Sequence, residues 1–178
     1  ITGFIASLIL FLAKTNNPDG GLYHLPYTQI LNEQKIIFGL NNLHFRFALV
    51  TLFQYSSAIF NNIFLGVEGI NIPTALVVSF FLFFLTSEII EIIYKKKIKN
   101  YLPLIFLTLL LLSSLYSFNR YSNYGNDVPL HVYYFLLIIL FYKFYFFDYD
   151  NDIFKVIFII ATFLFLNKIT FILCIFVP

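Results

Sequence analysis

Apolar residues run almost unbroken through several long stretches of this chain, and short polar segments separate them. The stretches are residues 1–13, 73–93, 101–118, 128–147 and 153–177, the last interrupted by Asn167 and Lys168. A helix of about 20 mostly apolar residues crosses the roughly 30 Å hydrocarbon core of a bilayer. The pattern therefore predicts an all-α protein, a polytopic transmembrane helical bundle in which each long stretch is a span.

Both ends of the chain lie inside apolar stretches, and the sequence contains no Met. We find no internal repeat and no low-complexity linker. We therefore interpret residues 1–178 as a single transmembrane domain and as a fragment of a longer membrane protein, with residues 1–13 as the end of a first span.

Two shorter segments between the first and second spans are amphipathic. Residues 26–38 carry apolar and polar residues on opposite faces, with Pro26 in the first helical turn and Gly39 as a C-cap. In residues 43–65 the polar side chains fall on one helical face, which suits either a helix in the membrane interface or a spanning helix inside a bundle. These polar residues are Arg46, Gln54, Ser57 and Asn61.

Basic residues near the span ends indicate the orientation. The sequence "KKKIK" at residues 95–99 is the densest basic cluster, and the positive-inside rule places it in the cytoplasm. Counting spans from it puts residues 119–131 outside and 148–155 inside. Residues 14–44 are also outside if 43–65 stays at the surface, and in the cytoplasm if that segment spans.

Composition supports a membrane protein. The chain is 60% hydrophobic and 11% charged, whereas soluble domains average about 25% charged residues. Its net charge of +2 argues against nucleic acid as a partner. The single cysteine, Cys174, cannot form an internal disulfide and is expected to be a buried thiol.

Three phrases carry a resemblance: "DGGLYHLP", "GLNNLHFRF" and "RYSNYGNDVPLH". Together with the order of span, acidic loop, two short helices and further spans, they resemble bacterial membrane proteins of the GT-C superfamily. These are polytopic glycosyltransferases that use polyprenyl-phosphate-linked sugars. The resemblance implies that 26–38 and 43–65 are juxtamembrane helices in the first outer loop, and that the protein resides in the bacterial inner (plasma) membrane.

In GT-C enzymes an acid of the first outer loop is the catalytic base, and the matching position is Asp19. The second acid that usually stands close by is replaced by Gly20 and Gly21. With this topology the loops 14–44 and 119–131 share the outer face and bring together all three histidines of the chain. We expect Asp19 and His24 to be catalytic. The expected substrate-binding residues are Tyr23, Glu33, His44, Arg46, Arg120, Asp127, His131 and Lys168.

Glycosyl transfer from a lipid phosphate needs a base for the acceptor proton and cations for the departing phosphate. Asp19 suits the first role, and Arg46, Arg120 or Lys168 suit the second. The expected partners are a lipid-linked sugar donor, a glycan or lipid acceptor, and membrane lipids. Some GT-C enzymes use a divalent cation and others do not, so Mg²⁺ or Mn²⁺ is compatible with the site but not required.

Plainer roles compete with these assignments. Asp19 follows Pro18 and suits a turn, Asp127 suits a helix N-cap, and Lys168 suits a polar break in the last helix. The rival functions are a polysaccharide polymerase or ligase, and a non-catalytic membrane subunit. A subunit without chemistry does not require the two outer loops to converge. A transporter would need polar residues within the spans, and 73–93 and 101–118 hold few.

Overall fold

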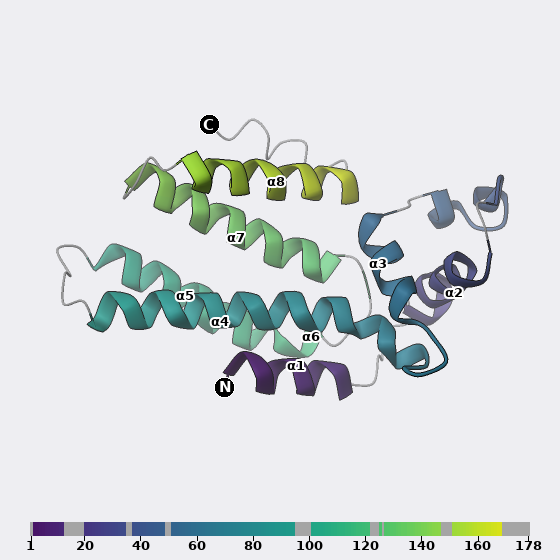
Figure 1. The fold of residues 1–178 in the computed structure, drawn as a ribbon, viewed down its shortest axis with the longest axis horizontal. Helices are drawn as coiled ribbons and strands as arrows, with labels where there is room; N and C mark the ends of the chain where they lie inside the picture. The colour runs from purple at the N-terminus through teal and green to yellow at the C-terminus, as the bar shows by residue number, and fades with distance from the viewer. Residues whose placement is uncertain are drawn as a thin grey trace.

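The computed structural model describes residues 2–12, 20–34, 37–48, 51–94, 101–121, 125, 127–146 and 151–168. The described residues form an all-α structure in which the longer helices lie along one another (Figure 1). These are α1 (Thr2–Leu12), α4 (Ile72–Tyr94), α5 (Leu102–Tyr116), α7 (Asp127–Phe146) and α8 (Asn151–Asn167). The short helices α2 (Leu25–Glu33) and α3 (Leu52–Phe60) gather at one end of this bundle.

Two of the described helices are long and apolar enough to cross a membrane. They cover Val67–Tyr94, which is α4 with the 3-10 turn η4 (Val67–Asn71) before it, and Asp127–Tyr145. Helix α5 is apolar but shorter. The two long helices coincide with the predicted spans 73–93 and 128–147, and α5 lies within the predicted span 101–118.

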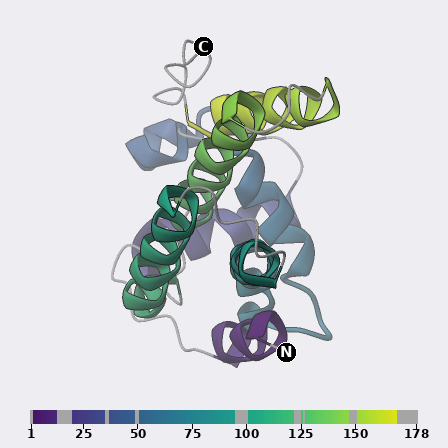
Figure 2. The ribbon, with the colours of Figure 1, turned by 90° about the vertical axis from the view of Figure 1, so that its left-hand side faces the viewer.

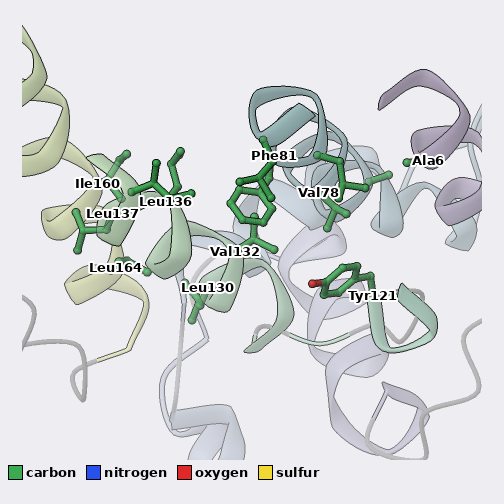
Figure 3. Close-up of a cluster of buried hydrophobic side chains, with 14 of the residues drawn as sticks. Ala6, Val78, Phe81, Tyr121, Leu130, Val132, Leu136, Leu137, Ile160 and Leu164 are labelled. Atoms are coloured by element: carbon green, nitrogen blue, oxygen red, sulfur yellow. The ribbon is translucent and has the colours of Figure 1, made fainter. Parts of the chain in front are cut away.

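The core is an apolar cluster with α4 at its centre. Helix α1 packs along one side of α4, and α5 and α7 also contact it, while α8 packs on α7. Figure 3 shows Phe81 and Val78 of α4 beside Val132 of α7. Viewed from the left-hand side of Figure 1, α4 and α7 lie between α1 and α8 (Figure 2). Close van der Waals packing of these apolar side chains holds the helices of the cluster together.

One glycine and one ion pair fix how these helices meet. A methyl group added at Gly3 would lie 3.0 Å from the backbone oxygen of Ser79, so Gly3 allows α1 and α4 to approach closely. Lys143 of α7 donates to Oε1 of Glu88 on α4 at 2.7 Å. The pair neutralises two charges that would otherwise be costly in an apolar bundle.

The first polar region, which we define as residues 20–65, differs from the predicted helices. The segment 26–38 forms a helix only to Glu33, and Gly39, with φ +82°, precedes the 3-10 turn η2 (Leu40–Asn42) and does not cap that helix. The segment 43–65 is not one helix either. It holds the 3-10 turn η3 (Phe45–Ala48), then α3, then a turn. Thr51 and Gln54 form a capping box that begins α3 as a separate helix.

Helix α8 also ends earlier than the predicted span 153–177, because its last helical residue is Asn167 and Lys168 lies beyond it. Residues 169–178 lie outside the described residues. The last described helix thus ends at Asn167, where the sequence showed its polar interruption.

Candidate functional site

Buried polar side chains gather at the end of the bundle that carries α2 and α3. In the part of the chain that the structure describes, they lie in or beside α2 and α3, at the start of α4 and toward the ends of α5 and α8. They are His24, Thr28, Thr51, Gln54, Ser57, Asn71, Thr74, Ser114 and Asn167. Buried polar groups are costly unless they are paired, so their concentration at one end makes this end the candidate site.

Four side chains of the first polar region form an aromatic and cationic cluster. Tyr23 lies in η1 (Gly20–His24), a short π-helical turn that leads directly into α2. Nη1 of Arg46 donates to the Tyr23 hydroxyl at 2.5 Å, and its guanidinium carbon lies 4.5 Å from the Tyr23 ring centroid. The ring of His44 stacks on Tyr23 at 5.9 Å between centroids. The cluster therefore holds one fixed cation beside two imidazoles.

His24 is the buried member of this cluster, with 9% of its surface exposed. Its ring centroid lies 4.2 Å from that of Tyr23, and its Nδ1 lies 3.4 Å from Nε2 of Gln54 on α3. Gln54 is held by the Thr51 capping box, so the amide that contacts the imidazole is fixed in place. This arrangement orients the other ring nitrogen, Nε2, away from α3.

Gly125, from the predicted polar loop 119–131 and just before α7, reaches the same imidazole. A methyl group added at Gly125 would lie 3.7 Å from Nε2 of His24. That distance is ordinary van der Waals contact, so Gly125 lies directly against this ring nitrogen. The loop after α1 and the loop before α7 thus meet at His24. His24 and Gly125 are 101 positions apart in the chain (125 − 24).

The end of α8 completes this side of the bundle. Nζ of Lys168 lies 2.7 Å from Oδ1 of Asp127 at the start of α7. Next to it, Oδ1 of the buried Asn167 accepts from the backbone N–H of Phe53 at 2.8 Å. Phe53 precedes Gln54, and Asp127 lies two positions beyond Gly125, so short chain links join this ion pair to His24.

Helices α2 and α3 lie side by side and run in the same direction. His24 and Gln54 meet at their N-terminal ends, and Asn32 donates to the backbone oxygen of Asn61 at their C-terminal ends. A cleft of 430 Å³ opens at the C-terminal ends, with a polar wall that includes Glu33. The polar wall consists of Gln29, Asn32, Glu33, Asn61 and Asn62.

The structure separates the expected site residues into three places. Tyr23, His24, His44 and Arg46 form the cluster, and Asp127 and Lys168 form the adjoining ion pair. Glu33 lines the cleft, about 13 Å along α2 from His24 at 1.5 Å per residue. Arg120 on α6 (Phe118–Tyr121) and His131 on α7 are exposed, and no contact described for them places them in these groups. Asp19 lies outside the described residues and is bonded to Gly20, the first residue of η1.

Sequence analysis predicted one polar face made of Arg46, Gln54, Ser57 and Asn61. The side chains of Arg46 and Gln54 contact Tyr23 and His24. Ser57 is buried, and Asn61 contacts Asn32 through its backbone oxygen.

Sequence analysis did not identify Asn167 as a buried contact of α3. The detectable signal was a lone amide in a long apolar stretch. It also overlooked the capping box, although Thr51 and Gln54 have the T-x-x-Q spacing that signals one.

Protonation and metal binding complete the picture of the site. Burial raises the pKa of the Tyr27 phenol, and Tyr55 adds to the rise, so Tyr27 stays neutral where it stacks on Phe47. Among the described residues, no three His, Cys, Asp or Glu side chains gather to hold a metal ion.

Comparison with known proteins gives a family without an assigned activity. No curated protein and no solved structure matches the chain. One family description covers every residue from 1 to 178. The chain therefore belongs to the family described as "Domain of unknown function (DUF8201)".

Proposed function

We propose that this protein is a membrane glycosyltransferase of the GT-C type, acting at the extracytoplasmic face in the assembly of cell-envelope glycans or glycolipids. One observation carries the proposal: the first polar region and the loop before α7 converge on His24, beside a cluster that holds a fixed arginine. A non-catalytic subunit gives no reason for such convergence. The order of elements also supports it, because two short helices follow α1 and further long helices follow them.

In the proposed reaction the acceptor hydroxyl attacks the anomeric carbon of a sugar carried on polyprenyl phosphate. A new carbon–oxygen bond forms, the bond to the phosphate oxygen breaks, and polyprenyl phosphate leaves with its charge. Asp19 takes the proton from the attacking hydroxyl as general base, and His24 orients that hydroxyl or assists the transfer. The nucleophile is the acceptor itself, so the protein needs no activated serine or cysteine.

The departing phosphate requires positive charge where it develops. Arg46 is the best placed cation, because Tyr23 holds it by a hydrogen bond and by contact with the aromatic face. Lys168 is the second, held by Asp127 on the neighbouring helix. Both lie at the end of the bundle that the positive-inside rule assigns to the outside of the bacterial inner membrane, within reach of a lipid-anchored donor.

The decisive experiment is transfer by the full-length protein in lipid nanodiscs, supplied with polyprenyl-phosphate sugars and with membrane glycans as acceptors. We expect product formation in the wild type and a loss of roughly 10²-fold in Arg46→Gln. Arg120→Gln is the matched control for an exposed arginine at the same end, and we expect it to lose less than Arg46→Gln. Equal loss in both variants, or no transfer from any lipid-phosphate sugar, contradicts the proposal.

A further inference from the structure

The cleft at the C-terminal ends of α2 and α3 has the chemistry of a saccharide site. Its volume of 430 Å³ falls in the range of small-ligand sites, roughly 300–1,000 Å³. Four of its polar wall residues are amides and the fifth is Glu33. An amide both donates and accepts hydrogen bonds, as each hydroxyl of a sugar does. Asn62 uses its amide on the neighbouring backbone, so Gln29, Asn32 and Asn61 are the amides that can serve sugar hydroxyls.

Hydrogen bonds hold this wall in place before any ligand arrives. Nε2 of Gln29 donates to Oε1 of Glu33 at 2.8 Å, one turn along α2. Nδ2 of Asn32 donates to the backbone oxygen of Asn61, which ties α2 to the end of α3. The amide oxygens of Gln29 and Asn32 keep their acceptor capacity, and a preorganised set of acceptors loses little side-chain entropy on binding.

The electrostatics of the cleft disfavour an anion. Glu33 is the charged residue of its lining, and the last turns of α2 and α3 add the partial negative charge of helix C-termini. At the other end of the same helix pair, Arg46 and Lys168 carry positive charge. The two ends therefore suit different ligands: a phosphate beside Arg46, and a neutral or cationic group beside Glu33.

An aromatic side chain completes the cleft. Phe64 lies at its edge with 96% of its surface exposed. A ring exposed to this extent contributes little to folding, and its apolar face suits the apolar C–H face of a pyranose ring. The amides can bind the hydroxyls of a sugar, and the Phe64 ring can pack on its apolar C–H face.

We infer that this cleft binds the acceptor of the proposed transfer, and that the acceptor is an oligosaccharide that is neutral or carries amino groups. Its role as the acceptor site rests on the proposed function, but saccharide binding does not. The cleft lies about 13 Å along α2 from His24, so a saccharide seated at Glu33 must extend beyond one sugar unit to present a hydroxyl there. A monosaccharide or an anionic lipid headgroup does not meet these requirements.

The test is binding of a panel of fluorescent oligosaccharides, neutral, amino-bearing and carboxylated, to the full-length protein in nanodiscs. We expect neutral or amino-bearing oligosaccharides to bind at least tenfold more tightly than carboxylated ones of equal length. Phe64→Ala should weaken that binding roughly tenfold. The matched control is Phe38→Ala, because Phe38 is 94% exposed and does not line the cleft, and its binding should equal wild type.

A second pair of variants tests the Glu33 carboxylate. Glu33→Gln should reduce the preference for amino-bearing over neutral oligosaccharides, whereas Glu68→Gln should leave it unchanged because Glu68 is exposed outside the cleft. The inference is overturned if no oligosaccharide in the panel binds, if carboxylated ones bind best, or if Phe64→Ala and Phe38→Ala bind alike.

Binding also separates this inference from the proposed function. Loss of binding in Phe64→Ala with no transfer from any donor in the wild type keeps the saccharide site and refutes the transferase. Transfer that depends on Arg46 but not on Phe64 or Glu33 keeps the transferase and refutes the cleft as its acceptor site.

Discussion

Nζ of Lys168 lies 2.7 Å from Oδ1 of Asp127, so the last residue described after α8 is joined to the first residue of α7. The pair is only partly buried, with 45% of the Lys168 side chain and 69% of the Asp127 side chain exposed. Exposed ion pairs stabilise a fold by about 0–1 kcal/mol, so stability alone gives little reason for this contact. The proposed function gives such a reason, because it uses Lys168 to hold the donor phosphate.

Lys168→Gln should therefore lower transfer by roughly 10²-fold while changing the free energy of unfolding by no more than about 1 kcal/mol. The measurements are transfer rates in nanodiscs and SDS-induced unfolding. Lys155→Gln is the matched control, because Lys155 also pairs with an aspartate, Asp152 at 2.7 Å, near the opposite end of α8. A similar loss of transfer in both variants contradicts a specific role for Lys168.

Asp19→Asn tests the proposed base. Asparagine keeps the shape of the side chain and still suits a turn, but it cannot accept the proton, so transfer should fall by roughly 10²–10⁴-fold with normal expression. The readout is single-turnover transfer by the full-length protein. Near-full transfer would show that Asp19 is a turn residue. Of the two other candidate bases in the sequence, Glu33 lies about 13 Å along α2 from His24, so the search would turn to Asp127.

Asn167→Ala should destabilise the junction of α8 with α3. It removes the acceptor of the Phe53 N–H and leaves a buried donor unpaired, which costs about 1–3 kcal/mol. Thr162→Ala on the same helix is the control, since Thr162 is exposed and its hydroxyl bonds only within the helix, to Phe158. Equal unfolding midpoints for the two variants would argue against the contact.

Gly69→Ala should distort the turn that leads from the cleft into α4. An added methyl group would lie 2.1 Å from the backbone oxygen of Phe60 and 2.9 Å from Cβ of Leu65, so the backbone must move. Such overpacking costs roughly 1–3 kcal/mol. Gly21→Ala meets nothing within 4 Å and should unfold like the wild type, and the same unfolding assay compares the two. A tolerated Gly69→Ala would mean that this turn is looser than described.

Cysteine labelling tests the orientation. In a Cys174→Ser background, Asn123→Cys should react with a membrane-impermeant maleimide added outside intact cells, and Lys97→Cys should react only after permeabilisation. The expectation follows from the basic cluster at residues 95–99 and the positive-inside rule. Labelling of position 97 but not 123 from outside would invert the topology and move the proposed site to the cytoplasm.

The sequence by itself determined the elements that depend on local pattern. Long apolar stretches are helical because an apolar surrounding leaves the backbone no partner but itself, and this identified 73–93, 101–118 and 128–147 from hydropathy alone. The polar pair Asn167 and Lys168, where α8 ends, and the amphipathic character of the first polar region were equally readable. The sequence overestimated helix length in 26–38 and 43–65, because periodicity does not show where a capping box such as Thr51 and Gln54 starts a new helix.

Only the tertiary structure decided which polar residues meet. Phe53 and Asn167 are 114 positions apart, Asp127 and Lys168 41, and His24 and Gln54 30. Hydropathy places such residues at the same end of a bundle but leaves each helix free to rotate about its axis. Packing of the apolar cluster around α4 fixes those rotations, and it thereby sets Gly125 against His24 and separates the cationic cluster from the cleft at Glu33.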